Sequence, residues 1–372
     1  MINLKNIGKF SDKIDITLLV CSIIASLIGI IIINSAAYSL DAHARYVIVQ
    51  SIALVLGVVA MTAAIFFNYT YLGKLRFVVF TLGIGLLILV LAVGKLSHGT
   101  QGWLVLGPVT LQPSEIAKLC FIVTVSYHTA KVKDSLNVPK TIVFLLLHFL
   151  CYSLPVILQP DFGTATVFAA IFAFILFFAG IGRKYIIGLA AFFAAASPIV
   201  WLLLADYQKK RIISFILPES DPTGSGYHVL QSKLAIGSGA IWGRGYINGP
   251  QTQQGYLPEK QTDFIFSVIG EEFGIFGALL LVTVLFIIIY RCFDNAKSCS
   301  HDTFGELICV GVGAMIFFHA AENIGMCLGL LPITGIPLPF ISYGGSNLVT
   351  CFAAVGLVQS VRMRRRATKF DM

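Results

Sequence analysis

The sequence predicts an all-α polytopic membrane protein with about ten membrane-spanning helices. Of its 372 residues, 57% are hydrophobic and only 12% are charged, whereas soluble domains average about 25% charged residues. The mean hydropathy is +0.87. Apolar runs of roughly 17–25 residues, each long enough to cross a bilayer, recur between short polar connections. The expected organisation is a single membrane domain over residues 1–372.

These runs place the predicted spans along the chain. The spans lie near residues 15–37, 46–67, 77–94, 114–130, 142–158, 164–181, 185–205, 264–290, 305–328 and 346–361. Lys5, Lys9 and Lys13 precede the first run, which is too long for the apolar core of a signal peptide. We therefore expect the first span to remain in the protein as an uncleaved anchor.

The positions of Lys and Arg predict which ends of the spans face the cytoplasm. The net charge is +8, and most basic residues fall in the N-terminal segment and in short connections on the same side of the predicted membrane. The segment 362–372 forms a basic tail on that side. Both termini are therefore predicted to be cytoplasmic. Because topology accounts for the basic excess, nucleic-acid binding is not expected.

The fourth predicted span opens with two charges inside an apolar run. Glu115 and Lys118 are three residues apart and share one helix face, and Pro113 suits the first helical turn. Charged side chains inside a membrane normally face the protein interior. Two interpretations remain open: a structural ion pair that holds helices together, or the polar wall of a site that opens outward.

A tight turn with proline and glycine separates the fifth and sixth spans. Asp161 lies in this turn, close to the predicted outer interface, where it is expected to cap the sixth span. His148 in span five and Asn323 in span nine are expected to be hydrogen-bonded core residues rather than ligands.

One long outer loop, residues 206–262, connects the predicted spans seven and eight. It opens with a basic patch that ends at Arg211. Its later part is rich in glycine, which allows close backbone approach or positive φ; these glycines are Gly237, Gly239, Gly243 and Gly245. A nucleotide-binding loop is not expected, since no strand precedes them. The mixture of aromatic, glycine and basic residues argues against disorder and favours a functional loop.

The eighth span begins directly after Asp263, where a polar segment gives way to an apolar run. Glu271 and Glu272 lie two to three turns further along the same run. Carboxylates at such positions are costly and are seldom retained without a partner or a function. For Asp263, one interpretation is a cap at the helix N-terminus, and the other is a functional carboxylate at the boundary between water and hydrocarbon.

The ninth span and the loop after it form the last polar region. His319 and Glu322 are three residues apart, and the loop at 329–346 is apolar but rich in proline and glycine. Irregular backbone at membrane depth must be buried in protein or line a cavity. The two halves of the chain show no internal repeat, which weakens the case for a transporter built from repeats.

Several motifs, in this order along the chain, resemble the SEDS family (shape, elongation, division and sporulation). They are Gln112-Pro113-Ser114-Glu115 with Lys118, Gln159-Pro160-Asp161-Phe162-Gly163-Thr164, Tyr207-Gln208 with Arg211, Asp221-Pro222 with Gly226-Tyr227, Leu257-Pro258-Glu259 with Thr262-Asp263-Phe264, Glu271-Glu272-Phe273-Gly274, and the Gly-Leu-Leu-Pro to Tyr-Gly-Gly-Ser loop. The stretch from Gln231 to Gly245 is more similar to the RodA-like elongation branch than to the FtsW-like division branch. Gly102 stands where the family usually has Arg.

The resemblance implies a ten-span peptidoglycan glycosyltransferase that polymerises lipid II on the outer face of the bacterial cytoplasmic membrane for cell elongation and rod shape. The essential carboxylate of the family corresponds to Asp263, as general base for the acceptor hydroxyl. Candidate cations for the undecaprenyl diphosphate are Lys118, Arg211 and Arg244, or a divalent cation such as Mg or Mn. Further residues implied in substrate binding or support are Glu115, Gln112, Ser114, Asp161, Lys233, Glu271, Glu272 and Tyr343.

The same resemblance implies a partner, a class B penicillin-binding protein that cross-links the strands, within the elongation machinery. Two other functions are weighed against it. A transporter that flips lipid II would use charges near the membrane midplane, and a scaffold without chemistry would tolerate loss of the Asp263 carboxylate.

Overall fold

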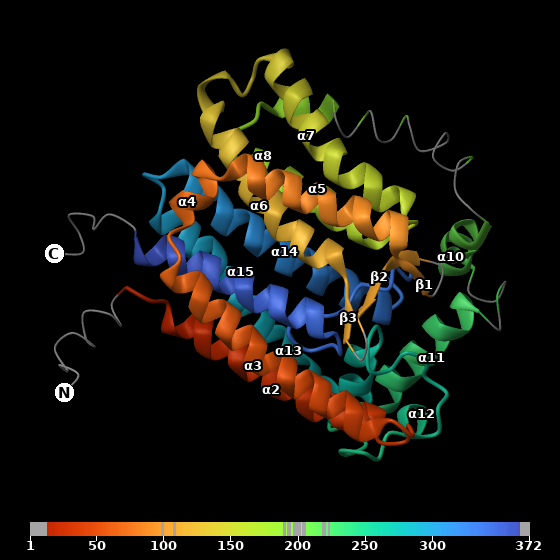
Figure 1. The fold of residues 1–372 in the computed structure, drawn as a ribbon. Coiled ribbons are helices and arrows are strands. Elements are labelled where there is room, and N and C mark those ends of the chain that lie inside the picture. Colours follow the sequence, from red (N-terminus) through yellow and green to blue (C-terminus); the bar gives the residue numbers. More distant parts are fainter. Residues whose placement is uncertain are drawn as a thin grey trace, which may run out of the picture.

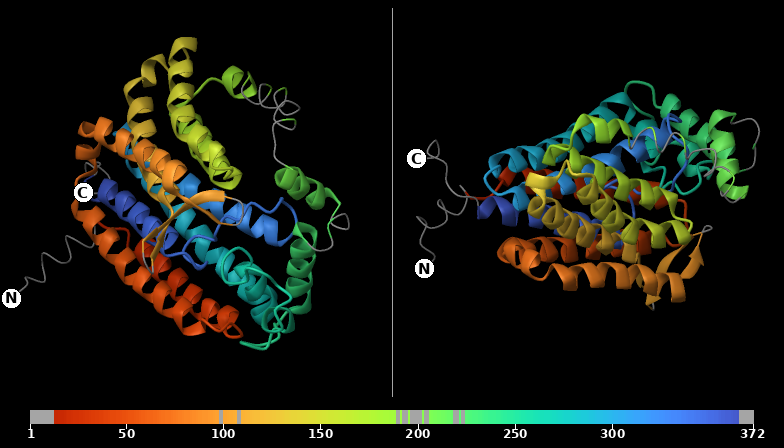
Figure 2. Two further views of the ribbon diagram at one scale, coloured as in Figure 1. Left: turned by 45° about the vertical axis from the view of Figure 1, so that its right-hand side comes forward. Right: turned by 90° about the horizontal axis from the view of Figure 1, so that it is seen from above.

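The protein is a bundle of long helices with both ends of the described chain on one side. The computed structural model describes residues 13–97, 100–106, 109–188, 206–217 and 224–364, together with Ala191, Ala195, Leu202 and Asp221. We call the end of the bundle near the two termini the terminal end, and the opposite end, which holds the three short strands, the loop end (Figures 1 and 2).

The described helices and strands are, in chain order, α2 (Ile16–Ala37), α3 (His43–Phe66), α4 (Tyr69–Lys74), α5 (Arg76–Val93), β1 (Lys95–Ser97), β2 (Thr100–Leu106), β3 (Val109–Leu111), α6 (Pro113–Lys131), η1 (Lys133–Ser135), α7 (Pro139–Leu158), α8 (Phe162–Ala179), α10 (Asp206–Ile216), α11 (Ser225–Ser238), α12 (Pro250–Gln253), α13 (Ile265–Ser298), α14 (Thr303–Cys327) and α15 (Gly345–Met363).

The prediction of a polytopic helical membrane protein is confirmed. Among the described residues, seven helices are long and apolar enough to cross a membrane: α2, α3, α5, α7, α8, α13 and α14. Helices α6 and α15 run through the bundle beside them (Figure 1). The predicted span at 185–205 lies mostly outside the described residues. Helix α8 ends at the terminal end of the bundle, and α10 lies at the loop end (Figure 1).

Helix α14 forms the centre of the bundle, and its residues from Leu307 to Ile316 are all buried. Small residues allow close contact between other helices: a Cβ on Gly356 of α15 would lie 2.5 Å from the carbonyl oxygen of Met61 on α3. On the outside of the bundle, large apolar side chains such as Phe77 remain exposed. This is the surface expected of helices that contact lipid.

The connection at 95–112 is rich in glycine, which is typical of turns, but it forms strands. It contains a three-stranded antiparallel sheet in the order β1-β2-β3, in which Leu104 pairs with Leu111 and Val105 with Thr110. The strands pair backbone groups that no helix pairs, and Val105 and Thr110 are β-branched residues that favour strands. The connection thus adds one small sheet to the helical membrane fold.

The eighth predicted span is not one continuous helix, because α13 is broken at Gly274 (φ 62°, ψ −159°). Backbone of the long loop pairs with the groups that the break frees. The N–H groups of Arg244 and Gly245 donate to the carbonyl oxygens of Glu271 and Glu272 at 2.9 and 3.0 Å. The N–H group of Ile275, just after the break, donates to the carbonyl oxygen of Ala240 at 3.0 Å. The break thus attaches the long loop to the bundle.

Asp15 joins three helices at the terminal end. Its carboxylate accepts hydrogen bonds from Arg291 Nε at 2.8 Å and Asn295 Nδ2 at 2.7 Å, both on α13. Its backbone exchanges two hydrogen bonds with the side-chain amide of Gln359 on α15, and its Oδ1 caps α2 through the N–H of Leu18. Burial raises the pKa of Asp15, but the hydrogen bonds from Arg291 and Asn295 lower it more, so that the pKa lies below its ordinary value.

We expect Asp15→Asn to destabilise the bundle by roughly 2 kcal/mol, somewhat less than the loss of a fully buried ion pair, because the Arg291 side chain is 24% exposed. The lowered pKa means that this stabilisation is complete above about pH 5 and is lost as the pH falls through the folded-state pKa. The thermal unfolding midpoint in detergent measures both effects. The matched control is Asp294→Asn, since Asp294 contacts the same Arg291 at 3.0 Å but is 33% exposed; its loss should stay below about 1 kcal/mol. Equal losses in the two variants would contradict this account.

Candidate functional site

Asp263 lies at the loop end, in the segment just before α13. Three hydrogen bonds hold this segment against α14 and against the apolar loop after it, residues 329–344, which we call the proline loop. Asn323 Nδ2 donates to the carbonyl oxygen of Asp263 at 2.8 Å. Ser342 Oγ donates to the carbonyl oxygen of Thr262 at 2.6 Å, and the N–H of Tyr343 donates to the carbonyl oxygen of Gln261 at 2.9 Å. The backbone around Asp263 is therefore fixed by groups from α14 and the proline loop.

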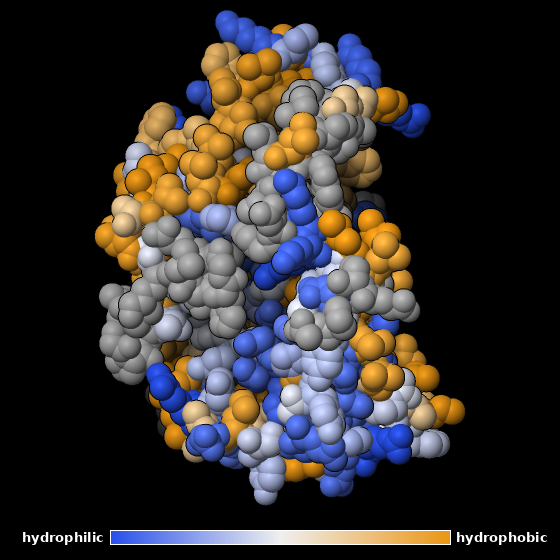
Figure 3. Space-filling model, turned by 90° about the vertical axis from the view of Figure 1, so that its right-hand side faces the viewer, coloured by the Kyte–Doolittle hydropathy of each residue, from blue (hydrophilic) through white to orange (hydrophobic). Residues whose placement is uncertain are grey.

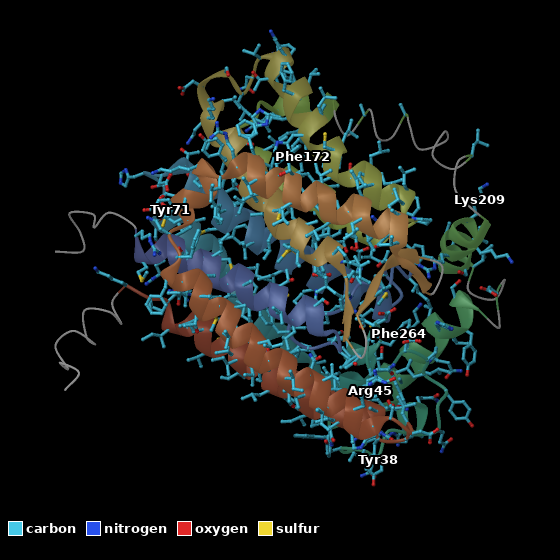
Figure 4. All side chains as sticks on the ribbon, in the orientation of Figure 1. Tyr38, Arg45, Tyr71, Phe172, Lys209 and Phe264 are labelled. Carbon is cyan, nitrogen blue, oxygen red and sulfur yellow. The ribbon has the colours of Figure 1, made fainter. Side chains whose placement is uncertain are left out.

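The side chain of Asp263 faces the proline loop. A Cβ on Gly335, which has φ +75°, would lie 3.4 Å from Asp263 Oδ2. The N-cap of α13 is Phe264, so Asp263 does not occupy the capping position that one interpretation of the sequence gave it. Phe264 is labelled in Figure 4 near the loop end, with Arg45 of α3 close to it in that view.

Glu115 and Lys118 form the ion pair that their spacing predicts. Lys118 Nζ lies 2.9 Å from Glu115 Oε1, and their side chains are 1% and 3% exposed. Lys118 Nζ also lies 2.8 Å from His319 Nε2 on α14, and Asn347 Nδ2 on α15 donates to Glu115 Oε2 at 3.2 Å. Three helices thus enclose the pair. Since a helix rises 1.5 Å per residue, Lys118 lies only roughly 8 Å along α6 from the loop end.

The proline loop lies between this ion pair and Asp263. Asn323 Nδ2 donates both to Asp263 and, at 2.8 Å, to the carbonyl oxygen of Ile336. One residue further, the carbonyl oxygen of Pro337 lies 3.4 Å from His319 Nδ1. The loop is buried, as its apolar sequence predicts, through Ile333, Ile336, Leu338, Phe340 and Ile341. Residues 335–337 therefore contact Asp263 through Gly335. Through Pro337 they contact a group that we call the Lys118 cluster, which consists of Glu115, Lys118, His319 and Asn347.

Asp161 caps α8, as its position in the turn predicts. Its carboxylate accepts hydrogen bonds from the N–H of Thr164 at 3.0 Å and from Thr164 Oγ1 at 2.8 Å. Gln112 Nε2 lies 3.5 Å from Asp161 Oδ2, which brings the start of α6 to the start of α8. Burial raises the pKa of Asp161 above its ordinary value, while the hydrogen bonds from Thr164 and the charge of Lys118 lower it. Ser114, in the first turn of α6, is buried.

Arg211 belongs to a second charged group at the loop end. Burial lowers the pKa of His228 on α11, and the charges that act on it are Glu259, Arg211 and Asp221. The His228 ring meets Phe264 edge to face, with ring centroids 6.1 Å apart. Arg211 therefore lies on the side of the bundle where the Asp263 segment begins. Figure 3 looks onto this end, where hydrophilic residues gather in the middle and lower part of the surface.

Lys233 and Arg244 have exposed side chains in the long loop. Lys233 lies over the C-terminal end of α14, because a Cβ on Gly329 would lie 2.6 Å from Lys233 Nζ. The negative end of the helix dipole favours an ammonium at this position. Arg244 attaches the long loop to Glu271 through its backbone N–H.

The carboxylates of Glu271 and Glu272 hold parts of the fold together. Glu271 is fully buried and accepts hydrogen bonds from the N–H groups of Gln251 and Thr252 at 2.7 and 2.9 Å, at the start of α12. Glu272 Oε1 accepts a hydrogen bond from Ser35 Oγ on α2 at 2.5 Å. Both side chains thus bind neighbouring segments at the loop end.

Tyr343 lies at the end of the proline loop. Its ring meets that of Tyr46 on α3 edge to face, with centroids 4.8 Å apart. Burial and Tyr46 raise the pKa of Tyr343 above its ordinary value, and Arg45 lowers it. Because the net pKa is raised, its hydroxyl group remains protonated at neutral pH and can donate a hydrogen bond.

The predicted close approach of the glycines in the long loop is confirmed at Gly239. A Cβ there would lie 1.9 Å from the carbonyl oxygen of Gly270, which is backbone and cannot rotate away. We expect Gly239→Ala to destabilise the protein by about 3 kcal/mol and to expose the long loop to limited proteolysis. Gly237→Ala is the matched control, since no atom lies within 4 Å of a Cβ at Gly237; it should be neutral or stabilising by up to about 1 kcal/mol. Similar proteolysis of both variants would contradict the steric argument.

The described residues do not by themselves form a metal-binding cage. Within the described ranges, no three His, Cys, Asp or Glu side chains come close enough together to hold an ion. Any divalent cation at this site would therefore need most of its ligands from a substrate or from water.

Sequence reasoning left two members of the cluster out of the site. The three-residue spacing of His319 and Glu322 was the available signal for His319, but its partner Lys118 lies 201 residues away. Asn347, which binds Glu115, lies in the first turn of α15, just after Gly344 and Gly345, and gave no separate signal. Glu322 is buried and lies 3.4 Å from Thr166 Oγ1 on α8.

These features define a polytopic helical membrane protein with a polar site at the loop end. In this site the ion pair of Glu115 and Lys118 lies on one side of the proline loop, and the Asp263 carboxylate lies on the other. The sequence matches the family model of the cell cycle proteins FtsW, RodA and SpoVE over residues 15–367. It is 41% identical over 283 residues to the peptidoglycan glycosyltransferase MrdB of Escherichia coli (strain K12), which covers 76% of each chain.

Two further similarities extend over nearly the whole chain. The probable peptidoglycan glycosyltransferase FtsW of Geobacter metallireducens is 31% identical over 378 residues, 99% of this chain and 98% of that one. A chain of a solved peptidoglycan synthase complex, described by its structural coordination of polymerization and crosslinking, is 28% identical with a TM-score of 0.79 and covers 94% of this chain and 97% of that one. The protein therefore belongs to the FtsW/RodA/SpoVE family, the SEDS proteins.

Proposed function

We propose that the protein is a peptidoglycan glycosyltransferase that polymerises lipid II, with Asp263 and Lys118 in one active site. The observation that carries this proposal is the proline loop, which contacts Asp263 through Gly335 and the Lys118 cluster through Pro337. A carboxylate and a buried ammonium held on either side of one loop suit a transfer that needs a base at one position and a cation at another.

In this reaction the Asp263 carboxylate takes the proton of the acceptor 4-hydroxyl group. The hydroxyl oxygen forms a bond to the anomeric carbon of the donor sugar, and the bond from that carbon to the diphosphate breaks. The electron pair of the broken bond leaves with the undecaprenyl diphosphate. Because attack and departure occur on opposite faces, the α-linked donor gives a β-linked product.

Lys118 is the cation best placed to stabilise the departing diphosphate. Its ammonium is buried and held by Glu115 and His319, so little reorganisation is needed when charge develops on the leaving group. Arg211 and Arg244 are further candidate cations.

A divalent cation, Mg or Mn, is part of the proposal because several carboxylates gather around the proline loop. Glu115, Asp161 and Glu322 lie near the buried ammonium of Lys118, and Asp263 lies against Gly335 of the same loop. A diphosphate would add more negative charge to this region. Bound Mg usually takes only one or two protein carboxylates and several substrate oxygens, which suits a site without a protein cage.

The depth of the charges argues against the transporter alternative. A transporter site would lie near the membrane midplane, whereas Lys118 and His319 lie roughly 8 and 12 Å from the loop ends of their helices. We place the loop end on the outer face of the bacterial cytoplasmic membrane, with both termini in the cytoplasm. This orientation follows the excess of Lys and Arg at the terminal end.

The proposed partner is a class B penicillin-binding protein, and the proposed setting is cell elongation. Similarity to a synthase complex described by polymerization and crosslinking supports a cross-linking partner. The elongation setting rests on the resemblance of the stretch from Gln231 to Gly245 to the elongation branch.

The test is incubation of the purified protein with lipid II, with and without its cognate class B penicillin-binding protein. We expect glycan strands that muramidase digestion converts to disaccharide units. Absence of strands under both conditions, together with lipid II crossing in vesicles that contain the protein, would support the transporter instead.

A further inference from the structure

His319 has one proton arrangement that suits both of its neighbours. Lys118 Nζ, 2.8 Å from His319 Nε2, is a donor with no lone pair. Nε2 must therefore accept, which places the ring proton on Nδ1. Nδ1 in turn faces the carbonyl oxygen of Pro337 in the proline loop at 3.4 Å, where an N–H donor fits. The imidazole thus connects the ammonium of Lys118 to the backbone of the proline loop.

The ammonium of Lys118 has one N–H group left over. Glu115 Oε1 and His319 Nε2 accept two of its three protons. In the described part of the chain, no third acceptor lies within hydrogen-bond distance of Nζ, and the Lys118 residue is 1% exposed. A buried ammonium with two fixed partners has its third N–H in a defined direction, and such a donor is available to a ligand.

We propose that His319 is a positioning residue for the transfer: it holds Lys118 so that the third N–H is directed to the diphosphate of the donor substrate. This inference rests on the proposed role of Lys118. His319 does not contact the reacting atoms; it acts through Lys118, and its contact with Pro337 ties that position to the loop that lies against Asp263.

A purely structural histidine would fill space between α6 and α14 without regard to which nitrogen accepts. Two amide variants separate these roles. In His319→Gln the terminal amide reaches the position of Nε2 and can accept from Lys118, whereas in His319→Asn the shorter amide reaches only the position of Nδ1 and can donate only to Pro337. His148→Gln is the control, because His148 lies on α7 and binds Thr124 and His128 instead.

The experiment measures kcat and KM for polymerisation of lipid II, together with the thermal unfolding midpoint, for each variant. We expect His319→Gln to keep kcat within about threefold and His319→Asn to lower kcat roughly ten- to a hundredfold, as for loss of a hydrogen bond to a charged group. KM should change little in both, because the interaction strengthens as charge develops on the leaving group. The control should match the wild type.

Equal kcat in His319→Gln and His319→Asn would overturn the inference, and so would losses confined to KM or to the unfolding midpoint. Lys118→Met in the same assay separates this failure from failure of the proposed function. If Lys118→Met is inactive while His319→Asn is fully active, only the role of His319 is wrong. If Lys118→Met is active, the proposed role of Lys118 is wrong as well.

Discussion

Asp263→Asn should lower lipid II polymerisation roughly a hundred- to ten-thousand-fold, the usual contribution of a general base. The substitution keeps the size of the side chain and the backbone hydrogen bond from Asn323 to the Asp263 carbonyl oxygen, but the amide cannot take a proton. Folding should therefore be preserved. Strand formation from lipid II, measured at equal amounts of folded protein, gives the result.

Two further variants make the Asp263 test specific. Asp263→Glu keeps the carboxylate but moves it by about 1 Å, so activity should lie between those of Asp263→Asn and the wild type. Asp294→Asn is the same chemical change at the terminal end, where Asp294 only pairs with Arg291, and should leave polymerisation unchanged. If Asp263→Asn makes strands at the wild-type rate, Asp263 is not the base, and a scaffold or a different base must be considered.

Lys118→Met should lower polymerisation roughly a hundred- to a thousandfold, as for loss of one preorganised group that stabilises developing charge. The same change leaves the buried carboxylate of Glu115 without its cation, so the protein should also lose about 3 kcal/mol of stability. Activity and the unfolding midpoint are measured together.

The double variant Glu115→Gln with Lys118→Met separates the two effects. Removing both charges should restore most of the stability, because no unpaired charge remains. It should not restore polymerisation, because the ammonium is still absent. A double variant that is both stable and active would show that the pair is the structural bridge that the sequence left open.

The sequence predicts the helical bundle and the local contacts of its site well, because both depend on residues close together in the chain. The spacing of Glu115 and Lys118 predicts their ion pair, and the turn at Asp161 predicts its cap on α8. The apolar runs predict the spans without any knowledge of packing. Each of these inferences uses only helix periodicity, capping chemistry and hydropathy.

The remaining features depend on contacts between distant segments. His319 binds Lys118 only because α14 passes beside α6, and nothing in the local sequence indicates that neighbour. The break at Gly274 requires backbone groups of the long loop to replace those of the helix. The strands at 95–111 arise because pairing satisfies backbone groups in a connection whose glycines suggest turns.

The central claim is that Asp263 and Lys118 act on one substrate pair, and the most direct measurement is a structure of the Asp263→Asn variant with lipid II bound. This account predicts the donor diphosphate within about 3 Å of Lys118 Nζ. It also predicts the acceptor 4-hydroxyl group within about 3 Å of the residue 263 amide, on the other side of the proline loop. Lipid II bound away from both groups, or a diphosphate near Asp263 with no contact to Lys118, would contradict it.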